Sequence, residues 1–208
     1  CYLGSYQPLA SLSFALEYDL FGANARVYHA TNLVLAFHNV MLLFYILQQW
    51  FPKRIGLVWF VSAVFAVQPF QVEVIAWIST RSTLLGYAFL LWAVFYYNKM
   101  CYKEGRKFTL ERYAMVFVFF VLACFSKSSA IVFAPFLFAI DYLYGIRVSY
   151  RKIVEKVPFF LVAIIFGIVS LYSRRVDLTL SNFYDYYNWY QHLLIRGKTN
   201  SIYLFSIM

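Results

Sequence analysis

The chain is built from long apolar blocks separated by short polar stretches. Within each block the apolar residues follow one another without the alternation that a membrane β-strand would show. Helices satisfy their backbone hydrogen bonds internally, so uninterrupted apolar blocks predict helices in a bilayer. The blocks cover residues 27–49, 55–68, 84–98, 113–126, 130–144 and 157–173.

The polar stretches predict how these helices alternate across the membrane. Positive residues follow the first, third and fifth blocks, at residues 53–54, 99–112 and 147–156. Loops enriched in Lys and Arg face the cytoplasm, so residues 55–98 and 113–144 should each go out and return. The limbs of these hairpins have about 14–15 residues, or about 21–23 Å of helix, against about 30 Å of hydrocarbon. Only the first block clearly reaches about 20 residues. Unless flanking residues extend the helices, we therefore expect both apexes, at 68–83 and 126–129, to be recessed, and we predict a polar cavity open to the non-cytoplasmic side.

Composition places the chain among integral membrane proteins. Hydrophobic residues make up 63% of the 208 positions and charged residues 13%, whereas a soluble domain is roughly 45–50% apolar. The net charge of +9 lies mostly in the short loops, where it sets orientation, so we expect membrane lipids and no nucleic acid as partners. The predicted fold class is all-α, a polytopic transmembrane helix bundle with about six spans.

The first apex carries polar residues that could take part in chemistry. These are Gln71, Glu73 and Arg81, together with the aromatic Trp77. If residues 72–81 form one helix, Glu73 and Trp77 share a face and Arg81 lies one turn further on. A carboxylate and a guanidinium suit hydroxyl and phosphate recognition. The alternative is an ion pair that caps the hairpin.

Further cations lie at the outer ends of later blocks. Lys127 stands among serines at the second apex, where it could bind an anion or simply extend to the interface. Arg174 and Arg175 end the last block on the outer side, against the orientation bias. They could meet a phosphate or lipid headgroups.

The first block holds His29, Asn32, His38 and Asn39. A metal would need more ligands converging, so interhelical hydrogen bonds are the favoured interpretation. Asp141, near the cytoplasmic end of the fifth block, is interpreted as structural. We assign no metal ligand, identify no cofactor, and leave open whether a divalent metal is required.

Several short motifs resemble the membrane region of the TMTC proteins and their bacterial relatives. Tyr28-His29, Asn32-Leu33 and Ser126-Lys127 match that family's patterns, as does the segment from Gln68-Pro69 to Arg81. Gln68 and Gln71 stand at its His positions, and Thr83 stands where an Asp often occurs. The resemblance runs from about residue 6 to residue 173.

The resemblance implies a GT-C glycosyltransferase, similar to protein O-mannosyltransferases. Such an enzyme would move a sugar, with mannose expected, from a polyprenyl-phosphate donor to a hydroxyl of a protein acceptor on the lumenal or periplasmic side. The hypothesis assigns donor-phosphate binding to Arg81, Lys127, Arg174 and Arg175, and substrate orientation to Glu73, Trp77 and Gln71. The catalytic residue is unknown and is expected to be an acid upstream of Cys1.

The chain is interpreted as one transmembrane domain fragment over residues 1–208. A first span and first outer loop are expected before Cys1, and further spans with tetratricopeptide repeats after Met208. A bacterial inner membrane is the predicted location, with the endoplasmic reticulum as the alternative. A non-catalytic scaffold or lipid-glycan-binding protein is the rival function. A transporter ranks last, because it would need polar residues through the cytoplasmic half of the bundle.

Overall fold

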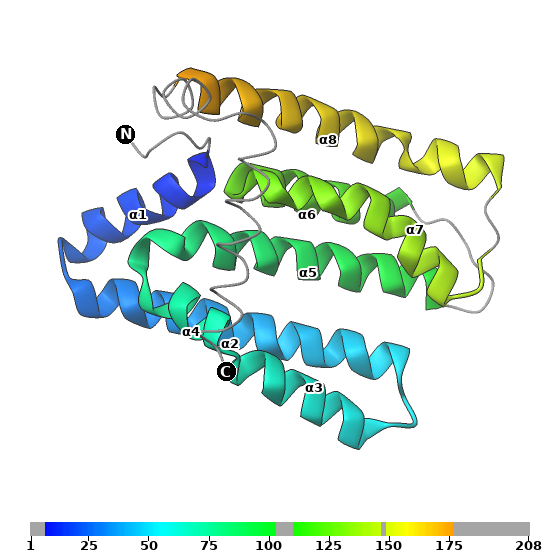
Figure 1. Cartoon of the computed structure of the whole chain (residues 1–208), viewed down its shortest axis with the longest axis horizontal. Helices are drawn as coiled ribbons and strands as arrows, with labels where there is room; N and C mark the ends of the chain where they lie inside the picture. The colour runs from blue at the N-terminus through cyan, green and yellow to red at the C-terminus, as the bar shows by residue number, and fades with distance from the viewer. Residues whose placement is uncertain (1–6, 103–109, 147–148, 177–208) are drawn as a thin grey trace, which may run out of the picture. The chain divides into compact units, whose positions relative to one another are not determined.

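The computed structural model describes residues 7–102, 110–146 and 149–176, and every element in them is helical (Figure 1). Two compact units divide the chain. One comprises residues 6–168; the described part of the other is the end of the last helix, from residue 169 to residue 176. The elements are α1 (Pro8–Phe21), α2 (Ala25–Trp50), α3 (Ile55–Val67), α4 (Pro69–Ala76), η1 (Ile78–Thr80), α5 (Arg81–Tyr102), α6 (Leu110–Ser126), η2 (Ser128–Val132), α7 (Phe133–Leu143) and α8 (Tyr150–Val176).

Each predicted block coincides in the main with one helix, except that the block at 130–144 is divided between η2 and α7. The helices α5 and α8 extend furthest beyond their blocks. Among the described residues, three segments are long and apolar enough to cross a membrane: Ala25–Trp50, Ile78–Cys101 and Lys152–Ser173. The prediction that only the first block reaches spanning length is therefore wrong. The apolar block begins only at residue 84 because residues 81–83 are polar. These three residues are nevertheless helical and buried, so α5 begins before the block does. Six spans remain a prediction, since α3 and the η2–α7 segment are shorter.

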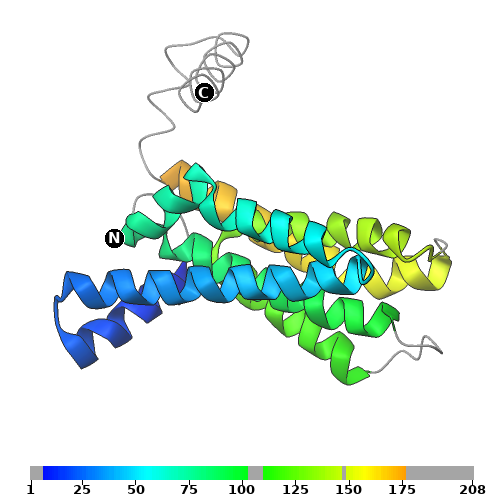
Figure 2. The same cartoon turned by 90° about the horizontal axis from the view of Figure 1, so that it is seen from below.

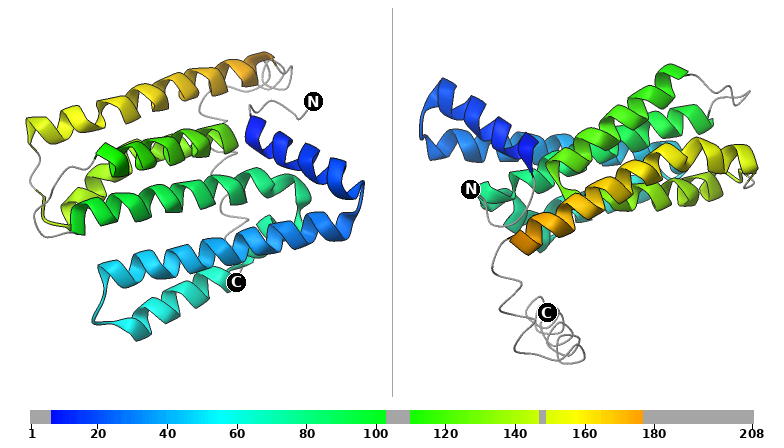
Figure 3. Two further views of the ribbon diagram at one scale, coloured as in Figure 1. Left: turned by 180° about the vertical axis from the view of Figure 1, so that it is seen from behind. Right: turned by 90° about the horizontal axis from the view of Figure 1, so that it is seen from above.

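Both predicted hairpins are present in the unit formed by residues 6–168. The helices α3 and α5 run in opposite directions and are joined through α4 and η1, while α6 and α7 are joined through η2 (Figures 1 and 3). The α2–α3 turn lies at the same end as the C-terminus of α5 and the N-terminus of α8. This arrangement confirms the alternation inferred from the positive residues. The side of the membrane that each end faces stays a prediction.

The helix α5 is central to the packing of this unit, with α2 on one side and α6 on the other (Figures 1 and 2). Ala93, Ala123 and Ala134 are fully buried. Small residues of this kind let helix backbones approach closely in a membrane protein. Phe120 and Phe159 fill the space between the helices, with ring centroids 5.6 Å apart.

A buried polar cluster joins α5, α7 and α8 at the end where α5 terminates. Lys156 forms a buried ion pair with Asp141, and the Tyr97 hydroxyl donates a hydrogen bond of 2.6 Å to the same carboxylate. The Lys156 ammonium also lies 4.3 Å from the centroid of the Phe138 ring. These contacts confirm the structural role predicted for Asp141.

Removing the charge of Asp141 should destabilise the fold, because Lys156 would then be buried without a counter-charge. We expect Asp141→Asn to lower the free energy of unfolding by about 3–5 kcal/mol. Glu155→Gln, which breaks the more exposed Lys152–Glu155 pair, should cost less than about 1 kcal/mol. Equilibrium unfolding in detergent measures both. Equal effects of the two substitutions would contradict this assignment.

Candidate functional site

The turn between α1 and α2 places an acidic side chain inside the bundle. Gly22 ends α1 in the left-handed region, at φ +64°, and its N–H donates to the carbonyl of Tyr18. A residue without Cβ adopts this conformation at little cost. Asn24 then caps α2 by accepting a hydrogen bond of 3.1 Å from the N–H of Arg26. The chain reverses here, so that α1 folds back beside α2 and carries Glu17 with it (Figure 2).

Arg81, the first residue of α5, is fully buried and each nitrogen of its guanidinium has a partner. Nη1 forms an ion pair with Glu17. Nε donates to Oδ1 of Asn32, and Nη2 donates to the carbonyl of Tyr28, both at 2.9 Å. The guanidinium carbon lies 4.4 Å from the ring centroid of Phe14. Arg81 therefore ties α1, α2 and α5 together, and its charge is balanced inside the fold.

The geometry corrects the predicted relation between Glu73 and Arg81. The helix α4 ends at Ala76, Trp77 is extended with ψ 115°, and η1 intervenes before α5. The prediction of one helix over residues 72–81 is therefore wrong. The alternative, an ion pair of Glu73 with Arg81 that caps the hairpin, is also wrong, because the acid that pairs with Arg81 is Glu17 of α1. Glu73 is exposed.

Three of the four polar residues named in the first block form the interhelical hydrogen bonds predicted for them. The Asn32 amide accepts from Arg81 and donates, at 3.4 Å, to the carbonyl of Trp77. The Asn39 amide donates to the carbonyl of Leu84 at 3.0 Å, and His38 accepts from the indole N–H of Trp92 at 3.0 Å. The prediction is thus confirmed for three of the four residues named. The fourth, His29, is exposed.

Lys127 occupies a one-residue break between α6 and η2. Its backbone is extended, at φ −152° and ψ 126°, while its N–H still donates to the carbonyl of Ala123 at 2.8 Å. This break directs the side chain toward α5, where the ammonium donates a hydrogen bond of 2.5 Å to the hydroxyl of Thr83. Lys127 is half-buried. Desolvation lowers the pKa of its ammonium below the usual range, because burial penalises the charged form.

Gly86 permits this close approach of α5 to the turn. A Cβ added at Gly86 would lie 3.3 Å from Cβ of Lys127 and 3.9 Å from that of Ser126. The first turns of α5 therefore carry Arg81, which is paired with an acid, and Thr83, which holds a lysine through a neutral hydroxyl. Among the described residues the ion pairs do not include Lys127.

The other predicted site residues are not gathered around Arg81. The side chain of Trp77 is 61% exposed. Gln71 lines a cavity of about 290 Å³ with otherwise mainly apolar walls, so this cavity is not the polar one predicted at the apexes. Arg174 and Arg175 belong to the last turn of α8, and their side chains lie outside the described part of the structure.

The sequence analysis did not identify Glu17 as the partner of Arg81 or Thr83 as the partner of Lys127. It also did not identify Gly86 as the residue at which α5 approaches the Lys127 turn. Glu17 could have been noticed as an acid in the otherwise mostly apolar segment that forms α1. No local signal marks Thr83 or Gly86, since their importance depends on the approach of α6 to α5.

Comparison with known proteins gives similarity over part of the chain. It is 34% identical over 95 residues to human Protein O-mannosyl-transferase TMTC1, which is 46% of this chain and 11% of the human protein. The chain is 34% identical over 95 residues to mouse Protein O-mannosyl-transferase TMTC1, which is 46% of this chain and 10% of the mouse protein. It is 32% identical over 96 residues to Drosophila melanogaster Protein O-mannosyl-transferase Tmtc1, which is 46% of this chain and 11% of the fly protein. The match thus spans about a tenth of each relative. No family model and no solved structure matches the chain.

The ion pair of Glu17 with Arg81 makes a testable prediction about stability. Glu17→Gln keeps the shape of the side chain but leaves a buried guanidinium without its counter-charge, which should cost about 3–5 kcal/mol. Asp19→Asn is the matched control, because Asp19 is an exposed acid on the same helix. Unfolding in detergent gives the two free energies. Protease cleavage within α1 should accelerate in the first variant only. If both variants unfold like the parent protein, Arg81 does not depend on Glu17.

Proposed function

We propose that this chain is the core of a membrane glycosyltransferase of the GT-C type. It would move a sugar, with mannose expected, from a polyprenyl-phosphate donor to a hydroxyl of a protein acceptor on the non-cytoplasmic side. Support comes from the similarity to proteins named as O-mannosyl-transferases and from the three helices long enough to cross a membrane. Because the match covers about a tenth of each relative, the activity of the whole protein is part of this proposal.

The observation that carries the proposal is the environment of Lys127. Its ammonium is half-buried and donates to a neutral hydroxyl, and the ion pairs of the described residues leave it without a carboxylate partner. A cation in this state is complementary to an anion such as the phosphate of the donor. When the sugar leaves, charge accumulates on that phosphate, and an ammonium already in position stabilises it.

Arg81 takes a different role in this proposal from the one that its position in the sequence suggested. The carboxylate of Glu17 already balances its charge, and the side chain is inaccessible. A donor phosphate would have to displace Glu17 to reach it. We therefore propose Lys127 as the principal phosphate contact and Arg81 as the residue that positions the first turn of α5. The donor-phosphate binding assigned to Arg174 and Arg175 stays a prediction.

The chemistry of the transfer assigns roles to the other candidate residues. The acceptor oxygen attacks the anomeric carbon, the bond from that carbon to the phosphate oxygen breaks, and the acceptor proton passes to a general base. That base is proposed to be an acid upstream of Cys1. Glu73 and Trp77 are exposed at the apex that adjoins α5 and would orient the sugar or the acceptor. Gln71 would do so from the wall of the cavity.

The location of the reaction also belongs to the proposal. The apexes face the side opposite the positive loops, which would be periplasmic or lumenal. A bacterial inner membrane was predicted, with the endoplasmic reticulum as the alternative. The relatives named above are animal proteins, so they lend no support to the bacterial location, which stays a prediction.

Removing the ammonium of Lys127 should weaken donor binding. Full-length protein in nanodiscs is titrated with polyprenyl-phosphate mannose and polyprenyl-phosphate glucose, which also identifies the sugar. We expect Lys127→Ala to weaken binding about tenfold or more, since a charge-assisted hydrogen bond contributes about 1.5–3 kcal/mol. Lys99→Ala, at an exposed lysine in the last turn of α5, should have no effect. Equal affinity of both variants and the parent would refute the role of Lys127.

The pH dependence of binding gives an independent check on the same lysine. The charged ammonium binds the phosphate, and burial lowers its pKa. Binding should therefore be complete below that lowered pKa and decline as the pH rises through it, at a lower pH than for an exposed lysine. The decline should be absent in Lys127→Ala. An identical decline in parent and variant would assign it to another group.

Gly86→Ala should disturb the site without removing any charge. The new Cβ would lie 3.3 Å from Cβ of Lys127, so α5 and the lysine must move apart by a few tenths of an ångström. We expect donor affinity to fall several-fold while the protein stays folded. Gly56→Ala is the control, because nothing lies within 4 Å of the Cβ added there. Unchanged affinity in Gly86→Ala would show that the approach of α5 to the turn does not set the position of the ammonium.

A further inference from the structure

The side chain of Lys127 lies against α5 at both of its ends. Its Cβ is close to Gly86, where an added Cβ would be 3.3 Å away, and its ammonium donates to the hydroxyl of Thr83. Gly86 follows Thr83 by three residues, so the two positions share one helix face and are about 4.5 Å apart along the axis. The lysine side chain therefore runs along α5 toward the N-terminus of that helix. Its ammonium lies at the first turn of α5, where the first apex ends.

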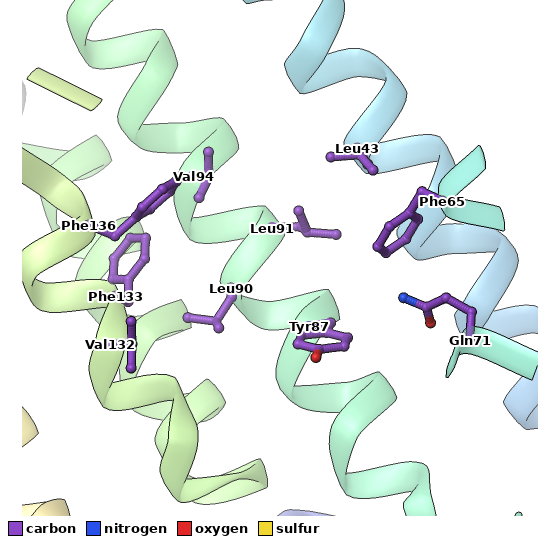
Figure 4. Close-up of a pocket in the computed structure, with 10 residues that line it drawn as sticks. All are labelled: Leu43, Phe65, Gln71, Tyr87, Leu90, Leu91, Val94, Val132, Phe133 and Phe136. Atoms are coloured by element: carbon purple, nitrogen blue, oxygen red, sulfur yellow. The ribbon is translucent and has the colours of Figure 1, made fainter. Parts of the chain in front are cut away.

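The opposite direction along α5 would bring the ammonium to apolar side chains. From Gly86 it leads to Leu90 and Leu91, which line the mainly apolar cavity described above (Figure 4). An ammonium among such side chains would be desolvated without a hydrogen-bond acceptor, which is costly. The hydroxyl of Thr83 thus selects the direction in which the lysine side chain extends.

Thr83 offers the ammonium an acceptor that is both fixed and neutral. The residue is 7% exposed, and branching at Cβ restricts its first side-chain torsion. An ammonium has three N–H donors, and the hydrogen bonds of the described residues use one of them, in the contact with Thr83. Two donors are then left for an anion. A carboxylate in this place would instead balance the charge of the lysine, as Asp141 does for Lys156 near the other end of α5.

We propose that Thr83 is a positioning residue, which directs the ammonium of Lys127 toward the first apex and leaves its charge to an anion. This inference rests on the proposed function, which identifies that anion as the donor phosphate. It adds a requirement on residue 83, which must carry a small neutral hydrogen-bond acceptor. An acidic residue there should hold the ammonium more firmly and yet weaken binding of the phosphate, because the positive charge would already be balanced.

The test compares Thr83→Asp with Thr83→Asn, two variants of the same shape that differ in charge. Full-length protein in nanodiscs is titrated with polyprenyl-phosphate mannose, and the unfolding temperature is measured in detergent without donor. We expect Thr83→Asp to bind the donor more weakly than Thr83→Asn by about tenfold or more, the loss also expected for Lys127→Ala. Its unfolding temperature should be the higher of the two, because the half-buried ammonium gains a counter-charge.

Two further variants test the hydroxyl itself. Thr83→Ser keeps the hydroxyl and should bind the donor like the parent protein. Thr83→Val keeps the shape of the side chain but has no acceptor, so it should bind the donor several-fold more weakly. Ser79→Ala is the control, because Ser79 is an exposed hydroxyl residue of the same apex, and its loss should leave the affinity unchanged.

The outcomes distinguish this inference from the proposed function. If Thr83→Asp both binds more weakly and unfolds at a lower temperature than Thr83→Asn, the role of Thr83 is structural only and the inference fails. Equal affinity of all four Thr83 variants, with binding still lost in Lys127→Ala, would also overturn the inference and leave the proposed function standing. If Thr83→Asp unfolds at the higher temperature but the parent binds no donor, the proposed function fails while the positioning of the ammonium stands.

Discussion

The interior of a bilayer offers no water to a charged side chain, so every partner of a buried guanidinium must come from the protein itself. Arg81 meets this constraint with a carboxylate from α1, an amide from α2 and a backbone carbonyl. Satisfying it fixes three helices relative to one another. Through Asn32 it also reaches the carbonyl of Trp77 at the end of α4. One buried charge thus joins α1, α2 and α5 and, through Asn32, the end of α4.

Lys127 lies near the same end of α5, but its electrostatic environment differs from that of Arg81. The ion pairs of the described residues leave it without an acid, and its contact with Thr83 is to a neutral oxygen. A half-buried ammonium in this state has an unmet preference for an anion. The pair Asp141–Lys156, at the other end of the bundle, shows the same fold neutralising a buried lysine completely. The contrast separates charges that hold the helices together from the charge of Lys127, which we propose is available to a ligand.

The helices, their order and the two hairpins could be predicted from the sequence, because apolar blocks and positive loops are local signals. The interhelical role of Asn32 and Asn39 followed from amides at membrane depth. The pairing of Glu17 with Arg81 could not, since it joins residues 64 positions apart through a turn at Gly22. Helical spacing instead suggested Glu73 as the partner of Arg81. That spacing does not apply, because the helix ends at Ala76 and Trp77 is extended. Lys127 was named from the sequence as a candidate anion-binding residue. Its contact with α5 could not be predicted, because it depends on the close packing of α5 at Gly86.

The most direct test of the proposed glycosyltransferase activity is a measurement of sugar transfer. Full-length protein in nanodiscs would be given polyprenyl-phosphate mannose with a labelled sugar and a mixture of peptides rich in serine and threonine, and label on peptide would be counted. If the protein is a glycosyltransferase with Lys127 at the donor phosphate, transfer should produce one free polyprenyl phosphate for each sugar moved and should fall steeply in Lys127→Ala. A folded protein that binds the donor yet never transfers its sugar would contradict it, and would leave a lipid-glycan-binding protein as the function.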